Sequence, residues 1–198
     1  MQEPGVCIWL TGLSGSGKTT TATRLVEVLE AAGKTVTLLD GDALRQRLFP
    51  ERGFTRVDRE RNVLSVAWIA AEIVRHHGIA ICALISPYRA GRAEARSLVG
   101  TDQFFEVFVD TPMDVCETRD VKGLYRQVRA GAVDRMTGID DPYEPPFHAD
   151  LTVGTTETTV DQNVGEILRG LHRRGLLRDV MDPGDLGQDH LDDQRTNG

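Results

Sequence analysis

The sequence predicts a three-layer α/β/α fold, in which helices cover both faces of a five-stranded parallel sheet. Short apolar runs suited to buried strands alternate with longer segments of helical periodicity, at the spacing of βαβ units. A glycine-rich turn joins the first apolar run directly to the first helical segment. The run at residues 79–85 is apolar throughout, as a central strand of a parallel sheet is.

The expected strands follow from these apolar runs. They lie at residues 5–11, 35–39, 79–85, 104–109 and 151–153.

The expected helices carry apolar residues at intervals of three and four. The first, at 20–32, ends at Gly33, and the second, from an N-cap at Asp58 to about His77, ends at Gly78. Pro112 opens a later helix that runs to Arg119. The other two helices are expected at 91–98 and 160–172.

Residues 12–19 read Gly-Leu-Ser-Gly-Ser-Gly-Lys-Thr, which is the P-loop pattern G-x-x-x-x-G-K-T. Its backbone N–H groups and the following helix N-terminus suit the β- and γ-phosphates of a nucleotide. Lys18 can reach the β/γ oxygens, and the Thr19 hydroxyl offers a ligand to Mg²⁺. A chance glycine-rich turn is the alternative, and the strand before and helix after the motif argue against it.

Composition predicts one domain with a tail. The chain has 198 residues, of which 40% are hydrophobic and 27% charged. We assign residues 1–178 to the domain and expect the acidic, polar residues 179–198 to be disordered. Within the domain, residues from about 120 to 148 mix charge, glycine and proline without a core periodicity. They are interpreted as a mobile lid that closes over substrates.

Charge and cysteine usage limit the environment and the partners. A net charge of −7 argues against broad nucleic-acid binding, and no apolar stretch is long enough to indicate a membrane partner. Residues 1–4 lack the basic and apolar regions of a secretory leader. Cys7, Cys82 and Cys116 stand singly, which suggests buried thiols. We therefore expect a cytoplasmic protein.

Polar residues follow the expected strands at the edge where the P-loop lies. Asp40 and Asp42 end the second strand, and the third ends in Ser86, where many P-loop enzymes carry an aspartate. The Mg²⁺ partner is therefore expected to be Asp40 or Asp42. Arg45, Arg59, Asn62, Ser86 and Lys122 add donors for an anionic second substrate, although each taken singly reads as solvated surface. No N-K-x-D motif is present, which weakens a GTPase interpretation.

Seven blocks in order give the chain a resemblance to one family. They are residues 9–18, 39–42 with Arg45, 53–54 with Asp58, Arg59 and Asn62, 85–88, 116–120, 122–125 and 137–144. From 5 to about 172 the chain resembles the adenylylsulfate kinases. These P-loop kinases transfer the γ-phosphate of ATP to the 3′-hydroxyl of adenosine 5′-phosphosulfate, giving 3′-phosphoadenylyl sulfate in sulfate activation.

The resemblance implies a division of the site. ATP and Mg²⁺ are the implied cofactors, with Thr19 and Asp40 at the metal. Lys18 would neutralise charge, and Asp42 or Asp40 would accept the hydroxyl proton. Ser86 is described in this family as a phosphoserine intermediate, but a hydrogen-bonding role is favoured because no base for it is evident. The implied ATP-binding residues are Gly12, Leu13, Ser14, Gly15, Ser16, Gly17, Lys18, Thr19, Thr20 and Arg119. The implied adenylylsulfate-binding residues are Asp40, Asp42, Arg45, Phe54, Arg59, Asn62, Ile85, Ser86, Lys122, Gly123, Leu124, Met136 and Thr137.

Three departures from the family pattern keep other hypotheses open. Ala43 replaces an asparagine, Arg61 a glutamate, and Met136 a phenylalanine that would cover the substrate adenine. The second hypothesis is a related kinase with another anionic nucleotide or a small hydroxyl metabolite as acceptor. The third is a non-catalytic nucleotide-binding module. The resemblance also implies a homodimer and a functional pairing with an ATP sulfurylase as candidate associations.

Overall fold

A computed structural model describes residues 4–121, 123–131, 136–178 and 180. Its sheet has five parallel strands, as predicted, and their order is β2-β3-β1-β4-β5. In the register, Leu10 of the central strand lies beside Ala83 and Val107 of its two neighbours. The strands are β1 (Val6–Thr11), β2 (Val36–Asp40), β3 (Ile79–Ala83), β4 (Phe104–Asp110) and β5 (Leu151–Gly154).

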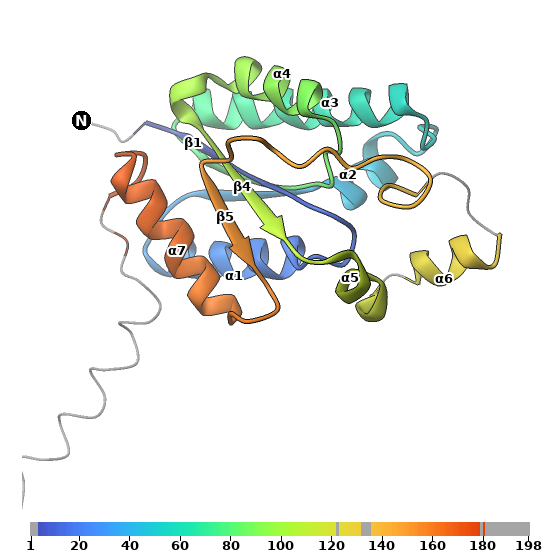
Figure 1. Cartoon of the computed structure of the whole chain (residues 1–198). Coiled ribbons are helices and arrows are strands. Elements are labelled where there is room, and N and C mark those ends of the chain that lie inside the picture. Colours follow the sequence, from blue (N-terminus) through green and yellow to red (C-terminus); the bar gives the residue numbers. More distant parts are fainter. Residues whose placement is uncertain (1–3, 122, 132–135, 179, 181–198) are drawn as a thin grey trace, which may run out of the picture.

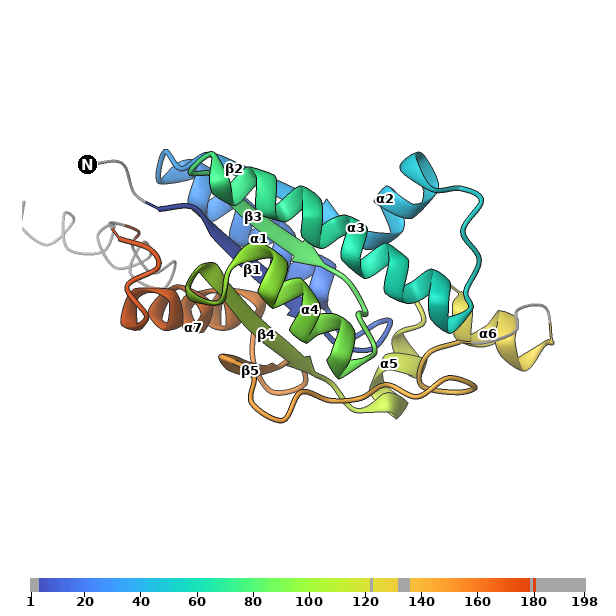
Figure 2. The ribbon, with the colours of Figure 1, turned by 90° about the horizontal axis from the view of Figure 1, so that it is seen from above.

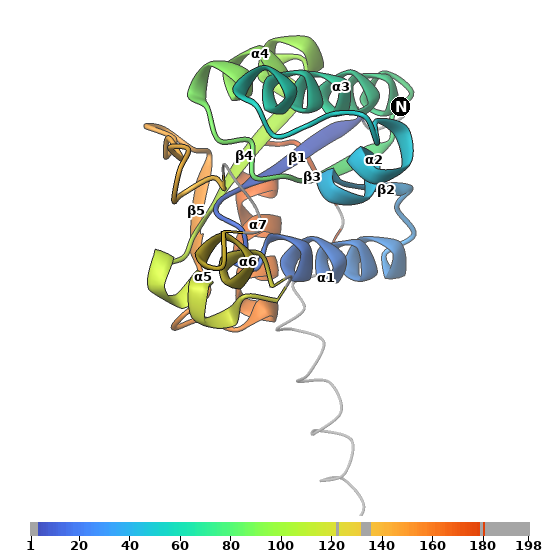
Figure 3. The same cartoon turned by 90° about the vertical axis from the view of Figure 1, so that its right-hand side faces the viewer.

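Helices cover both faces of this sheet (Figures 1 and 3). Helices α1 (Lys18–Ala31) and α7 (Val160–Arg173) pack against one face, and α3 (Arg56–Arg75) and α4 (Arg89–Val99) against the other. Because both faces are covered, all six residues of β1 are buried. The three-layer prediction is confirmed.

Each layer boundary has its own hydrophobic core. Leu25 and Leu29 of α1 meet Ile167 and Leu171 of α7 beneath the sheet. On the opposite face, Val66 and Ala70 of α3 pack near Trp9 and Phe104, whose ring centroids are 5.5 Å apart. These cores fix the strands, and with them the loops at the strand ends.

The carboxyl ends of the strands and three short helices lie at the same end of the molecule (Figure 2). The helices are α2 (Gly41–Leu48), α5 (Met113–Arg119) and α6 (Leu124–Arg129). Cys116, Tyr125 and Met136 form a small buried cluster that joins α5 and α6. In doubly wound folds this edge is where ligands bind.

Several boundaries differ from the predictions. Helix α3 starts earlier than expected, because its N-cap is Thr55 and not Asp58. Asp58 is instead the N3 partner of a capping box, in which its carboxylate accepts from the Thr55 backbone N–H. Strand β3 ends at Ala83, two residues before the predicted Ile85.

The predicted lid segment, about 120–148, contains more order than its composition indicated. It includes α6, and its buried residues Tyr125 and Met136 belong to the third core cluster. The disorder predicted for the tail falls almost entirely outside the described residues. None of the helices in the described ranges is long and apolar enough to cross a membrane.

Candidate active site

A cavity of about 370 Å³ opens at the carboxyl edge of the sheet. Residues from the P-loop, α2, α3, α5 and the turn after β3 line it, so segments far apart in sequence meet there. Its wall includes these predicted site residues: Ser14, Gly15, Gly17, Lys18, Thr19, Thr20, Asp40, Asp42, Arg45, Phe54, Arg59, Asn62, Ile85, Ser86 and Arg119.

The P-loop needs glycine at its tightest positions. Gly15 has a φ of +77°, and a Cβ added there would lie 2.8 Å from the carbonyl oxygen of Cys116. Gly17 has a φ of +101° and is the N-cap of α1. Lys18 Nζ donates to the carbonyl oxygens of Gly12 at 2.9 Å and Leu13 at 2.6 Å. Lys18 is therefore hydrogen-bonded to its own loop, and it lies on the cavity wall beside the proposed phosphate-binding residues.

The second strand brings a carboxylate to the start of α1. The Thr19 hydroxyl donates to Asp40 Oδ2 at 3.1 Å. Asp40 Oδ1 accepts from the backbone N–H groups of Asp42 and Ala43, both at 3.0 Å, so Asp40 caps α2. This carboxylate is held in place from two sides.

The Thr19 and Asp40 oxygens fit Mg²⁺. This ion takes hard oxygen ligands, usually one or two carboxylates together with phosphate oxygens and water. Among the described residues there is no group of three or more His, Cys, Asp or Glu side chains that could hold a metal. The donor set is thus of the kind that binds Mg²⁺ together with a nucleotide, and it does not resemble an all-protein metal cage.

Two guanidinium groups stand over one aromatic ring on the opposite wall. The Arg45 guanidinium carbon lies 4.7 Å from the centroid of the Phe54 ring, and that of Arg59 lies 5.8 Å from it. Burial and the positive charge of Arg59 lower the pKa of Arg45. A bound anion would relieve the repulsion between the two cations.

Helix α3 contributes two buried polar side chains to this wall. Arg59 is only 6% exposed; its Nε donates to the Phe54 carbonyl at 3.1 Å and lies 3.3 Å from Asp141 Oδ2. Asn62 is 5% exposed, and its Oδ1 has no hydrogen-bond partner within the described ranges. Buried polar atoms nearly always find a partner, so an unpaired oxygen on a residue that lines the cavity makes Asn62 a candidate ligand-binding residue.

Ser86 is held by its neighbours. Its hydroxyl accepts from Trp9 Nε1 at 3.1 Å and donates to Thr11 Oγ1 at 3.0 Å, and Thr11 in turn donates to the carbonyl of Ile85 at 2.8 Å. The residue is 3% exposed. Its proton therefore points to Thr11, and no general base contacts the hydroxyl among these partners.

Several predicted residues lie outside the cavity wall. Gly12, Leu13 and Ser16 lie behind it in the P-loop, and Gly123 precedes α6. Met136, predicted to cover the substrate adenine, instead packs in the cluster of Cys116 and Tyr125, against which Leu124 also packs. Thr137 is 1% exposed, with its hydroxyl oxygen unpartnered in the described part of the chain. Lys122 lies outside the described residues.

The cavity residues that were not predicted from the sequence include one in α6 and three after β5. Tyr125, Thr155, Thr158 and Asn163 line the cavity. The Tyr125 hydroxyl donates to the carbonyl of Ser14 at 3.0 Å, and Arg119 Nη1 donates to Thr155 Oγ1 at 2.8 Å. The predicted strand at 151–153 was a usable signal, because the carboxyl ends of parallel strands share one edge.

A three-layer parallel fold, a P-loop with its lysine, a carboxylate beside the P-loop threonine and a second, cationic wall define a P-loop kinase. The model of the adenylylsulphate kinase family matches residues 4–154. The chain belongs to this family.

Individual relatives agree with the family assignment. The chain is 46% identical over 178 residues to the adenylyl-sulfate kinase of Synechococcus sp. (strain JA-3-3Ab), covering 90% of this chain and 100% of that one. The structure of the Mycobacterium tuberculosis APS kinase in complex with AMPPNP and APS matches with a TM-score of 0.82 and 38% identity, over 86% of this chain and 99% of that one. A hexameric APS kinase from Thiobacillus denitrificans matches with a TM-score of 0.67 and 34% identity, over 89% of this chain and 30% of that one.

Proposed function

We propose that this kinase transfers the γ-phosphoryl group of ATP to the 3′-hydroxyl of adenosine 5′-phosphosulfate, giving 3′-phosphoadenylyl sulfate and ADP. One observation carries the proposal: a single cavity has a P-loop on one wall and, on the other, Arg45, Arg59 and Asn62, whose Oδ1 has no partner among the described residues. The first wall suits a triphosphate. The second suits a nucleotide whose anionic group needs guanidinium partners.

The P-loop wall holds the donor. The P-loop residues on the cavity wall, from Ser14 to Thr20, would bind the phosphates, and Lys18 would exchange its contacts with the Gly12 and Leu13 carbonyls for phosphate oxygens. Thr19 and Asp40 are the proposed Mg²⁺ residues. When bound, Mg²⁺ supplies charge neutralisation to the β- and γ-phosphates. Arg119, whose guanidinium group spans Gly15 and Thr155, adds a cation at the P-loop.

Two aspartates are candidates for orienting the 3′-hydroxyl, and we assign this role to Asp42. Asp40 already caps α2 through Oδ1 and accepts from Thr19 through Oδ2. Asp42 lies in the first turn of α2, on the cavity wall. The 3′-oxygen bonds to the γ-phosphorus while the bond to the β,γ-bridging oxygen breaks, and the hydroxyl proton passes to Asp42.

The cationic wall holds the acceptor. Arg45 and Arg59 would pair with the phosphosulfate, and the half-exposed Phe54 ring would stack on the adenine. Asn62 Oδ1 would accept a hydrogen bond from the nucleotide, and the Thr137 hydroxyl, which has no partner among the described residues, stays a predicted contact. Ile85 and Ser86 would contact it from the turn after β3. Lys122, Gly123, Leu124 and Met136 remain predictions for a closed state of the lid.

Direct transfer requires no phosphoserine. The Ser86 hydroxyl donates to Thr11, which supports a hydrogen-bonding role over a nucleophilic one. With γ-³²P-labelled ATP, we expect label in the nucleotide product and none on the protein. A Ser86→Ala variant that keeps substantial turnover would agree, and stoichiometric labelling of Ser86 would contradict direct transfer.

The proposed function is tested by ADP release with a panel of acceptors. We expect saturable release with adenylyl sulfate and little with AMP, ADP, nucleosides or small hydroxyl metabolites. The panel addresses Ala43 and Met136 directly, because saturation by another acceptor alone would assign the site to that compound.

Substitutions of the two aspartates separate their roles. Asp42→Asn should lower kcat by roughly 10²- to 10⁴-fold, the range for loss of a general base. Asp40→Asn keeps an N-cap for α2 and should instead raise the Mg²⁺ concentration needed for half-maximal rate. The opposite pattern would exchange the assignments.

Two broader proposals concern assembly and location. We propose a homodimer, since the Thiobacillus denitrificans relative is an oligomer, a hexamer, and a functional pairing with an ATP sulfurylase that supplies adenylyl sulfate. Light scattering after size exclusion measures the first, and co-purification measures the second. The three cysteines in the described residues are buried free thiols, which supports a reducing compartment such as the cytoplasm.

A further inference from the structure

A buried arginine outside the cavity wall contacts the substrate-binding turn. Arg92 lies on α4, and 2% of it is exposed. We infer that Arg92 is a positioning residue for adenylyl sulfate: it holds the turn 85–87 in its binding shape by joining that turn to β4 and to the segment 143–145. This inference rests on the proposed function and assigns a new residue to the same site.

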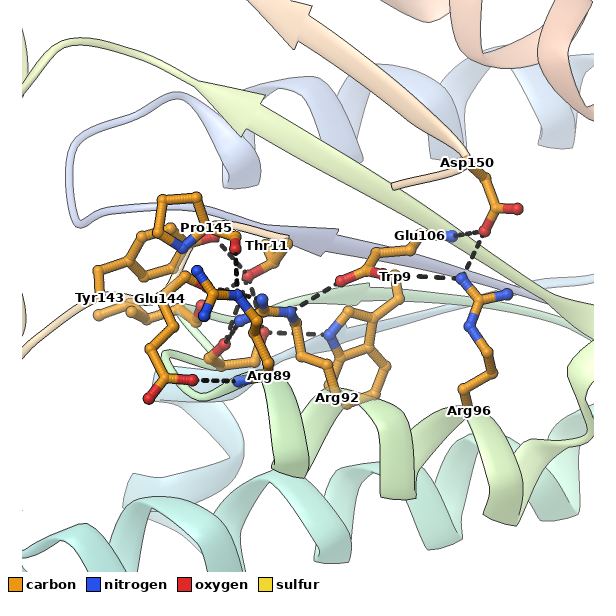
Figure 4. A network of polar contacts seen from close by, with 12 residues as sticks. Trp9, Thr11, Arg89, Arg92, Arg96, Glu106, Tyr143, Glu144, Pro145 and Asp150 are labelled. Atoms are coloured by element: carbon orange, nitrogen blue, oxygen red, sulfur yellow. Dashed lines mark hydrogen bonds and ion pairs between the residues drawn. The ribbon is translucent and has the colours of Figure 1, made fainter. Parts of the chain in front are cut away.

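Three segments meet at the Arg92 guanidinium group (Figure 4). Its Nε donates to Glu106 Oε1 of β4 at 2.8 Å. One terminal nitrogen, Nη1, donates to the Ser86 carbonyl at 2.6 Å, and the other, Nη2, donates to the Glu144 carbonyl at 2.7 Å. A planar, fixed fork of donors is suited to such a junction, and a single ammonium group is not.

The turn that Arg92 contacts requires external support. Ser86 has a φ of +39°, in the left-handed region that non-glycine residues seldom adopt. Such conformations persist where surrounding contacts over-determine them. Here the carbonyl of the strained residue accepts from Arg92, and its side chain is bonded to Trp9 and Thr11.

The segment 143–145 also contacts the same turn indirectly, through Thr11. The Tyr143 hydroxyl lies 2.9 Å from Thr11 Oγ1, and the Tyr143 ring stacks on Phe108. Because Thr11 gives its own proton to the Ile85 carbonyl, Tyr143 is the donor in this pair. Ile85 and Ser86 are therefore connected to the segment 143–145 directly through Arg92 and, by way of Thr11, through Tyr143.

Arg96 provides an internal control. It lies one turn along α4 from Arg92 and also faces Glu106, at 3.6 Å. Its other polar contacts in the described residues are Asp150 Oδ2 at 2.6 Å and the Phe104 carbonyl at 3.2 Å. Arg96 thus shares the ion-pair network and the helix with Arg92. Its hydrogen bonds to Asp150 and Phe104 do not involve the turn.

The experiment compares Arg92→Lys and Arg92→Gln with Arg96→Lys and Arg96→Gln by steady-state kinetics. Misplacing a binding group by about 1 Å can cost roughly 10²-fold, so we expect kcat/KM for adenylyl sulfate to fall by roughly ten- to a hundredfold in the Arg92 variants. The KM for ATP should stay at the wild-type value. The Arg96 variants should lower thermal stability yet leave both KM values unchanged.

A second readout needs no substrate. The chain has two tryptophans, and the indole N–H of buried Trp9 donates to Ser86. In ¹H–¹⁵N spectra, Arg92→Lys should shift the Trp9 indole signal and speed its hydrogen exchange, whereas Arg96→Lys should leave it in place. The Trp68→Phe variant assigns the two signals.

The outcomes separate the inference from the proposed function. A wild-type protein inactive with adenylyl sulfate overturns the proposed function, and the Trp9 signal still tests the link between Arg92 and the turn. An active wild type whose Arg92→Lys variant keeps its KM and its Trp9 signal overturns the inference, as would equal losses in the Arg92 and Arg96 variants. If Arg92→Gln fails to fold, Arg92→Lys and Tyr143→Phe test the inference. Tyr143→Phe removes the hydrogen bond to Thr11 and should raise the KM for adenylyl sulfate but not that for ATP.

Discussion

The two walls of the cavity are built in different ways. The phosphate-binding wall comes mainly from one continuous stretch, residues 12–20, whose lysine is bonded to the carbonyls of its own loop. The acceptor wall is assembled from α2, the loop that carries Phe54, α3 and the turn after β3. It contains adjacent guanidinium groups and the unpaired Asn62 oxygen. The first wall is therefore stabilised by contacts within one loop, and the second depends on contacts between separate segments.

This difference has a consequence for substitutions. Changes in the phosphate-binding wall should affect the donor and leave the fold intact. Changes in the acceptor wall should weaken the binding of adenylyl sulfate. A change that removes an unpaired polar atom should not destabilise the protein, because burying that atom already costs free energy.

Lys18→Ala should have the largest effect. Loss of a charge aimed at the transferred phosphoryl group is expected to lower kcat by roughly 10²- to 10³-fold or more. The melting temperature should change far less than kcat, since the tight turns of the loop depend on its glycines. Lys34→Ala, in the connection between α1 and β2, is the control in a steady-state assay. Wild-type kcat in Lys18→Ala would contradict the P-loop assignment.

Asn62→Leu should raise the KM for adenylyl sulfate about tenfold, equivalent to one lost hydrogen bond to a ligand, without changing that for ATP. Its thermal stability should equal or exceed that of the wild type. The matched variant is Asn163→Leu, because Asn163 is equally buried but bonded to the Thr158 hydroxyl and the Gly154 carbonyl. It should lose about 1–3 kcal/mol of unfolding free energy. If both variants were destabilised alike, Asn62 would have a structural partner after all.

Alkaline pH should lower the stability of the protein through ionisation of Tyr143. Burial raises the pKa of Tyr143 to about 12, whereas an unfolded tyrosine titrates near 10. The folded state holds the proton more tightly, so this contribution is complete below about pH 10 and is lost between about pH 10 and 12. Between about pH 10 and 12 the free energy of unfolding should fall less steeply in Tyr143→Phe than in the wild type, by up to about 1.4 kcal/mol per pH unit. Urea unfolding at pH 8 to 11 measures it, and identical slopes would contradict the assignment.

Thr55→Ala should have the smallest effect. Thr55 caps α3, the helix that carries Arg59 and Asn62, and loss of such a cap costs about 1 kcal/mol. A small rise in the KM for adenylyl sulfate, with ATP unaffected, should accompany it. Thr55→Ser keeps the hydroxyl and should restore both values. A change in the ATP parameters would show that the walls are not independent.

The sequence was most informative where structure is local. The parallel sheet and its two helical layers follow from hydrophobic periodicity, and the P-loop from one contiguous motif. Helix starts were less accurate: Asp58 looked like an N-cap, because a capping box places an acidic residue three positions after the true cap.

The acceptor wall was harder to predict because it depends on contacts across the chain. Arg45, Phe54, Arg59 and Asn62 were named from rim position and family resemblance, and the structure brings them to one cavity. No local sequence pattern predicts that the Tyr125 hydroxyl donates a hydrogen bond to the Ser14 carbonyl, or that Met136 packs against Cys116 and Tyr125. The spacing of Arg92 did not distinguish it from a surface arginine, since its three partners come from three separate segments.

The independence of the two walls can be measured by calorimetric titration of Lys18→Ala and Asn62→Leu. Each variant is titrated with adenylyl sulfate and, separately, with a nonhydrolysable ATP analogue and Mg²⁺. We predict a crossed result: Lys18→Ala binds adenylyl sulfate like the wild type but the ATP analogue weakly, and Asn62→Leu does the reverse. Loss of the same ligand in both variants would contradict the account.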